Sequence, residues 1–96
     1  GLSHKTARYA TFNGEERKNI RMQSGEKLHM EWNVTVEKGS LTLEIQDPDG
    51  YTLWKESFTT DDRGSYDLTA EKNGLYTLRI RGGSTGGGYE LDWEIQ

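Results

Sequence analysis

The sequence predicts an all-β fold: an antiparallel β-sandwich of about eight strands, formed by residues 1–96 as a single domain. Three observations support this prediction. Apolar and polar residues alternate with a period of two along most of the chain, as in strands with one face in the core and one in water. Turn-forming pairs such as Asn-Gly and Ser-Gly separate these stretches at short intervals. A helical period of about 3.6 residues is not sustained anywhere for ten residues.

Four strands are predicted in the first half of the chain, at residues 6–12, 17–23, 28–36 and 41–46. The first two alternate less regularly, although Ile20 and Met22 are spaced to point into a core. The third and fourth place an apolar residue at every second position. Parallel strands, buried on both faces, show continuous apolar runs, so this alternation indicates antiparallel pairing. The turns between these strands are assigned to Asn13-Gly14, Ser24-Gly25 and Lys38-Gly39.

Four more strands are predicted in the second half, at residues 52–58, 65–69, 76–81 and 89–95. The last two flank a glycine-rich stretch, residues 82–88, which we interpret as the flexible tip of a hairpin. A phosphate-binding loop would be followed by a helix, whereas a strand follows here. The pairs expected across this hairpin are Ile80 with Leu91, Leu78 with Trp93, Arg81 with Glu90 and Arg79 with Asp92.

The inward positions of these strands predict the hydrophobic core. Only 31% of the residues are hydrophobic, but the chain has 3 Trp, 5 Tyr and 2 Phe. Large rings bury much surface per residue, so a thin two-layer core is attainable. The residues expected in it are Met30, Trp32, Val34, Leu43, Ile45, Tyr76, Leu78, Ile80, Leu91 and Trp93.

Composition excludes several classes of protein. The chain has 12 Lys and Arg against 16 Asp and Glu, a net charge of -4, which argues against nucleic acid or an anionic membrane as the main partner. No apolar run is long enough to span a bilayer. Cysteine is absent, which excludes a catalytic thiol, a disulfide framework and a cysteine-based zinc site.

Residues 40–95 carry a series of motifs with a shared order and spacing. They are Leu41-x-Leu43-x-Ile45-x-Asp47-Pro48-Asp49-Gly50, Gly64-Ser65-Tyr66-Asp67-Leu68-Thr69-Ala70, Asn73-Gly74-Leu75-Tyr76-x-Leu78-x-Ile80 and Tyr89-x-Leu91-x-Trp93-x-Ile95. This series resembles the GOLD (Golgi dynamics) family of β-sandwich domains. The resemblance implies a GOLD-like or jelly-roll sandwich and a non-catalytic role in protein interaction.

The chain departs from the lumenal members of that family, which carry a cysteine pair, a coiled coil and a membrane span. A role with secretory cargo is therefore not implied. The closing strand is also similar to that of secreted bacterial β-sandwich modules, so we expect an exported, extracytoplasmic bacterial protein. Because the chain begins with Gly1 rather than Met, we interpret it as an excised or processed domain, with any signal peptide or lipid anchor upstream.

Asp47 and Asp49 are weak candidates for calcium ligands, with Asp61 and Asp62 nearby in sequence. The spacing does not fit an EF-hand loop. Asp47-Pro48-Asp49-Gly50 instead has the composition of a type I turn whose first Asp accepts backbone N–H groups. We therefore predict no metal site and no cofactor.

No catalytic residues are predicted. The only histidines are His4 and His29, and the Gly-x-Ser-x-Gly motif of many hydrolases does not occur. A carboxylate pair for glycoside cleavage could come from Glu90, Asp92 and Glu94, but such an alternating row is more typical of a solvated strand face. The chain is thus predicted not to be an enzyme.

Alternation fails in one strand, residues 52–58, and this points to a candidate binding site. If Leu53 faces inward, Lys55 does too; if Trp54 faces inward, Glu56 follows it. The strand is therefore expected to bulge or end near Trp54 at a sheet edge. The tentative binding residues are Tyr51, Trp54 and Phe58.

Two functions remain open, with a small hydrolase as a third and weakest alternative. The first is a non-catalytic protein-interaction or structural module of an exported or cell-envelope protein. The second is a carbohydrate-binding module that uses exposed aromatic residues. A coplanar pair of exposed rings would favour sugar, whereas an apolar patch or an open sheet edge would favour a protein partner.

Overall fold

The computed structural model describes residues 2–96, which form five β-strands and no helix. All strand pairs are antiparallel, as the sequence predicts. The strands are β1 (Leu2–Met22), β2 (Lys27–Gln46), β3 (Thr52–Phe58), β4 (Asp62–Thr69) and β5 (Gly74–Ile95).

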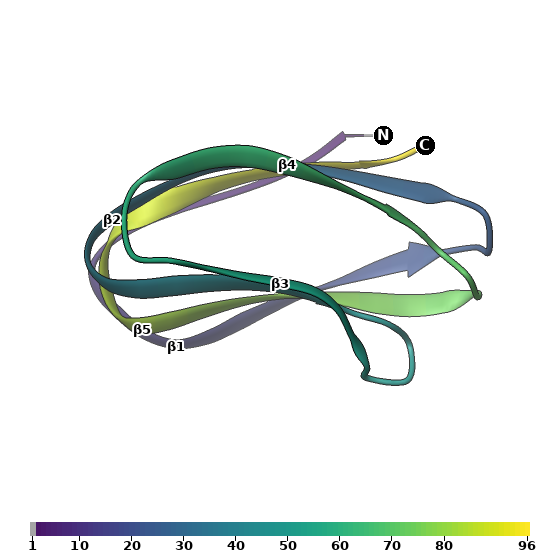
Figure 1. Cartoon of the computed structure of the whole chain (residues 1–96), viewed down its shortest axis with the longest axis horizontal. Helices are drawn as coiled ribbons and strands as arrows, with labels where there is room; N and C mark the ends of the chain where they lie inside the picture. Colours follow the sequence, from purple (N-terminus) through teal and green to yellow (C-terminus); the bar gives the residue numbers. More distant parts are fainter. Residues whose placement is uncertain (1) are drawn as a thin grey trace.

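Three of these strands are long enough to belong to two layers. Strands β1, β2 and β5 have 21, 20 and 22 residues, and each folds back on itself at one end of the molecule (Figure 1). The first half of β2 pairs with β4, and its second half pairs with β3. The β4 layer therefore has the order β1-β5-β2-β4, and the β3 layer has the order β1-β5-β2-β3.

The predicted number of strands is wrong: five continuous strands replace the expected eight. The eight predicted segments all fall on strands, with only Gln23 beyond a strand end, but three pairs are joined, namely 6–12 with 17–23, 28–36 with 41–46 and 76–81 with 89–95. Register shifts occur between Tyr9 and Gly14 in β1 and between Val36 and Ser40 in β2. Such irregularities bend a strand sharply without ending its pairing, so they resemble turns in the sequence.

The predicted hairpin across residues 82–88 is also wrong. This glycine-rich stretch lies inside β5, and residues 85–88 are buried. Gly87 has φ +123°, and a Cβ at this position would lie 2.1 Å from the carbonyl oxygen of Thr35. Glycine is needed here because backbones approach closely at the bend, not because the segment is a flexible tip.

The strand pairs assigned to that hairpin are therefore replaced by others. Leu78 lies opposite Lys18 and Ile45, and Leu91 lies opposite Lys5 and Trp32. In each layer, one half of β5 lies between β1 and β2. The charged pairs expected between the two halves of β5 consequently do not form.

All ten predicted core residues are buried, with exposed fractions of 6% or less. The predicted inward positions Ile20 and Met22 are buried as well. They pack in one cluster between the two layers with other apolar side chains, among them Leu28, Val36, Leu41, Phe58, Ala70 and Tyr89. Period-two alternation thus identified the core correctly.

The two sides of the sandwich differ in how their edges are formed. On one side, the bent β1 is the edge of both layers. On the other side, β3 is the edge of one layer and β4 is the edge of the other, and each pairs only with β2 among the described strands. We call this second side the β3/β4 edge.

Candidate functional site

Aromatic residues gather at the β3/β4 edge. Trp54 of β3 stacks on Trp32 of β2, with ring centroids 5.3 Å apart, and on Tyr66 of β4, at 4.9 Å and an interplanar angle of 17°. We call these three rings the aromatic stack. Phe58 lies 5.8 Å from Trp32 and supports it from the core. The stack therefore connects β3 and β4, the edge strands of the two layers.

A bulge in β3 determines which side chains join the stack. Ile45 pairs with Trp54, but the next residue, Gln46, pairs with Thr52, so Leu53 is the extra residue of a bulge. Trp54 and Glu56 then take the inward phase, and Glu56 stays exposed because β3 is an edge strand. The predicted bulge near Trp54 at a sheet edge is confirmed.

The three predicted binding residues occupy different environments. Tyr51, just before β3, is 71% exposed. Trp54 is partly exposed, and the rings of Trp32 and Tyr66 cover part of its surface. Phe58 is only 6% exposed and belongs to the core. Tyr51 and Trp54 are therefore available at the surface, but they do not form a coplanar platform with Phe58.

A hollow of about 160 Å³ lies at the same edge. Its apolar lining comes from Leu53 of β3, Leu68 of β4 and Tyr76 of β5, and its polar rim includes Lys72. Leu53 is 41% exposed, so the wall of this hollow is open to solvent. Sequence reasoning missed the hollow because its walls come from three different strands, and only the fold shows that these side chains meet.

The calcium candidates Asp47 and Asp49 are engaged in a turn and an ion pair. The Oδ1 atom of Asp47 accepts hydrogen bonds from the N–H groups of Asp49 and Tyr51, both at 2.9 Å. The Lys72 ammonium contacts Asp49 and lies 3.3 Å from Asp47. Burial raises the pKa of Asp47, but the Tyr51 N–H, Lys72 and the Asp49 N–H together lower it further than burial raises it.

The other nearby carboxylates also have partners in the fold. Asp61 accepts a hydrogen bond from the N–H of Val36, and Asp62 accepts one from the indole Nε1 of Trp32 at 2.8 Å. Within residues 2–96, no three acidic or histidine side chains are grouped to hold a metal ion. The absence of a metal site stays a prediction.

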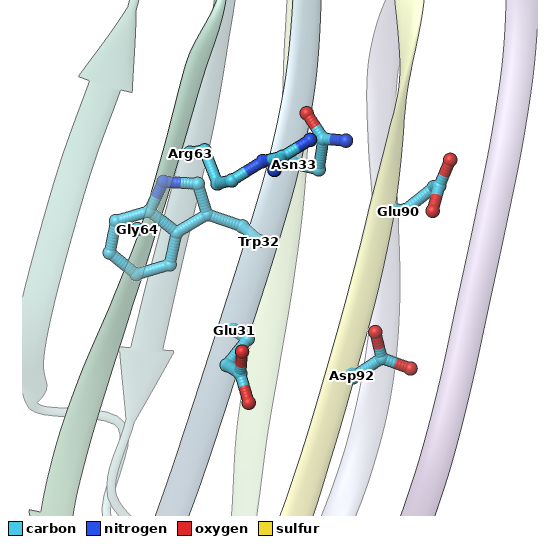
Figure 2. Close-up of a pocket in the computed structure, with 7 residues that line it drawn as sticks. All are labelled: Glu31, Trp32, Asn33, Arg63, Gly64, Glu90 and Asp92. Carbon is cyan, nitrogen blue, oxygen red and sulfur yellow. The ribbon is translucent and has the colours of Figure 1, made fainter.

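A second hollow, of about 230 Å³, lies on the outer face of the β4 layer (Figure 2). Glu31 lies opposite Asp92, while Asn33 lies between Glu90 and Arg63 in the adjacent cross-strand row. Three carboxylates, an amide and a guanidinium can together hydrogen-bond a polar ligand. Only the cross-strand register brings these side chains together, so their spacing along the sequence does not indicate a binding site.

Both histidines lie on this outer face and contact carboxylates. His4 Nδ1 is 2.6 Å from Asp92, and His29 contacts Asp67 through Nδ1 and Glu31 through Nε2. The hydrogen bond to Asp67, followed by that to Glu31, raises the pKa of His29. Neither imidazole shows a hydrogen bond to a Ser or Thr hydroxyl in the described part of the chain.

No protein-family model matches the sequence. No curated protein matches it either. The described residues contain no helix long and apolar enough to cross a membrane.

Several solved structures share the fold. A periplasmic inhibitor of g-type lysozyme, PliG from Aeromonas hydrophila, is 11% identical and superposes with a TM-score of 0.68, over 99% of this chain and 86% of that one. The pre-peptidase C-terminal domain of a Bacillus anthracis collagenase is 12% identical, with a TM-score of 0.66 over 96% and 88%.

The carbohydrate-binding module TmCBM61, solved with β-1,4-galactotriose, is also 12% identical, with a TM-score of 0.57 over 100% of this chain and 86% of that one. Identities this low show the fold alone. They show that the chain has the architecture of all-β sandwich modules.

Proposed function

We propose that this chain is a non-catalytic protein-interaction module of an exported or cell-envelope protein, and that its partner binds at the β3/β4 edge. One observation carries the proposal: a hollow lined in part by apolar side chains opens between the two edge strands. Exposed Leu53 forms part of its wall, and exposed Tyr51 and partly exposed Trp54 are close to Leu53 along the chain. An exposed edge with aromatic anchors is a recurrent way to bind an extended segment of another protein.

In this mode the partner adds a strand to β3. Main-chain hydrogen bonds give affinity, and an apolar side chain of the partner enters the hollow between Leu53 and Leu68. Tyr51 and Trp54, on either side of Leu53 in the chain, supply further contact surface along β3. The inhibitor PliG is a fold neighbour that acts on another protein, and its periplasmic origin supports an extracytoplasmic location. The GOLD resemblance points to the same kind of function.

The proposal is tested by selecting partners from a phage-displayed library of random peptides with the intact domain. We expect selected peptides that lose binding to Trp54→Ala but keep binding to Leu75→Ala. Leu75 is a suitable control because it is 43% exposed and lies on β5. Loss of the stacking contacts should lower the melting temperature of Trp54→Ala, so a native circular dichroism spectrum and a cooperative unfolding transition above the assay temperature show that each variant is folded. Peptides that bind both variants equally, or no enrichment at all, would overturn the proposal.

A carbohydrate-binding module is the second candidate. It is favoured by the polar hollow of Glu31, Asn33, Arg63, Glu90 and Asp92, and by the sugar-bound fold neighbour TmCBM61. It is disfavoured because no coplanar pair of exposed rings is formed among the described residues. Titration with β-1,4-galactotriose, followed by amide chemical shifts, separates the two candidates: shifts confined to this hollow would support sugar binding.

A further inference from the structure

The outer face of the β3 layer is basic although the whole chain is acidic. Cross-strand register places Arg17 beside Arg79, and Arg79 beside Glu44, which in turn lies opposite Lys55. The same face also carries Arg21, Arg81 and Glu15. Five basic side chains and two carboxylates give this face a net charge of +3.

Two carboxylates hold the centre of this basic face in place. Glu44 is 5% exposed and lies 3.1 Å from Arg79 Nη1, while Glu15 contacts both Arg79 and Arg17. These hydrogen bonds, Arg79 first and Arg17 second, lower the pKa of Glu15 to about 2. These contacts fix the positions of the side chains at the centre of the face.

The outer face of the β4 layer has the opposite sign. Its carboxylates occupy neighbouring cross-strand rows, with Asp92 opposite Glu31. The face carries five carboxylates and three basic side chains, a net charge of -2 with neutral histidines. The carboxylates are Glu31, Asp67, Glu90, Asp92 and Glu94, and the basic side chains are Arg8, Lys27 and Arg63.

We propose that the domain associates with further copies of itself, head to tail, with the β4-layer face of one copy on the β3-layer face of the next. The two faces are complementary in charge and are built from the same number of strands. A two-fold symmetric pair would bring like faces together, and opposed like charges repel. The arrangement is heterologous, so the stack is open-ended.

The size of the faces sets the expected strength of this association. The Cα trace measures 38 Å along its longest axis and 16 Å along its shortest, which runs across the strands (Figure 1). A face thus covers about 600 Å² before side chains are added, below the roughly 800 Å² per partner of standard interfaces. The association is therefore weak and is reversed by salt.

Sedimentation velocity on the whole domain tests the proposal with two charge-reversal variants. The first, Arg17→Glu with Arg21→Glu, makes both faces acidic; the second, Glu31→Lys with Glu90→Lys, makes both faces basic. Wild type should associate at low ionic strength and high protein concentration, and should become monomeric at about 0.5 M salt. Each variant alone should remain monomeric, and an equimolar mixture should associate again.

A matched control changes the net charge as much as the second variant but leaves both faces intact. Glu37→Lys with Glu71→Lys alters exposed residues elsewhere and should still associate. Trp54→Ala should also associate, which separates this proposal from partner binding at the β3/β4 edge. A wild type that is monomeric at all concentrations, association that stops at a dimer, or a mixture that stays monomeric would each overturn the proposal.

Discussion

At the scale of single residues, cross-strand and turn contacts decide what each charged group can bind. Asp47 and Asp49 are separated by one residue, which is compatible with either a turn or a cation site. In the structure Asp47 accepts hydrogen bonds from two backbone N–H groups, and both carboxylates contact the Lys72 ammonium. A calcium ion would have to displace the Lys72 ammonium and compete with the backbone N–H groups for the Asp47 carboxylate.

We therefore expect the melting temperature to be the same, within error, in chelator and in millimolar calcium. Any ion that binds the native state must stabilise it, so differential scanning calorimetry is a direct check. A rise of several degrees on adding calcium would contradict the turn assignment of Asp47 and Asp49. The same rise in an Asp49→Asn variant would place the ion elsewhere.

His29 makes stability depend on pH. Its pKa is raised above the ordinary 6.5 by hydrogen bonds to Asp67 and then Glu31. A raised folded-state pKa means that the stabilisation is complete below about pH 6.5 and is lost as pH rises through the raised value. We expect the melting temperature to fall between pH 6 and pH 8, and to fall less in His29→Gln. Equal slopes for the two proteins would contradict this assignment.

At the scale of strands, the bends in β1, β2 and β5 create the sandwich. Gly87 and Gly50 both have positive φ values, +123° and +90°. A Cβ on Gly87 would meet the Thr35 carbonyl at 2.1 Å, whereas a Cβ on Gly50 would have no neighbour within 4 Å. The two glycines thus share a backbone requirement but differ in the space around them.

Gly87→Ala should consequently destabilise the fold by about 1–3 kcal/mol more than Gly50→Ala, because only Gly87 adds a steric clash to the backbone strain. Urea unfolding of the two variants measures the difference. Equal losses would mean that the bend can relax, and that close backbone approach at Gly87 does not define it.

At the scale of the whole molecule, the layers share three strands and one core, so they should unfold together. Leu78 and Leu91 belong to different halves of β5, and both are fully buried. Leu78→Ala and Leu91→Ala should each cost about 2–5 kcal/mol. Each variant should unfold in a single transition with a lower midpoint than the wild type. Tryptophan fluorescence and circular dichroism should give the same midpoint for that transition. Separate midpoints would show that the layers are independent units.

The β3/β4 edge shows where sequence reasoning reached its limit. The broken alternation around Trp54 correctly predicted a bulge at an edge, because either phase of a regular strand would point a charged side chain toward the core. The strand position of Phe58 predicts that it belongs to the same site, but its side chain fills the core. Leu68 and Tyr76, which line the hollow, come from other strands, so the sequence of residues 51–58 gives no indication of them.

The sequence by itself determined the all-β class, the antiparallel pairing and the buried residues, because alternation is a local consequence of one face meeting the core. Tertiary structure alone decided that residues 82–88 continue a strand instead of ending a hairpin. Glycines serve a bend and a turn equally well, and only the approach of β2 at Thr35 distinguishes the two. It likewise decided that Arg79 faces Glu44 and not Asp92, since strand neighbours depend on the path of the whole chain.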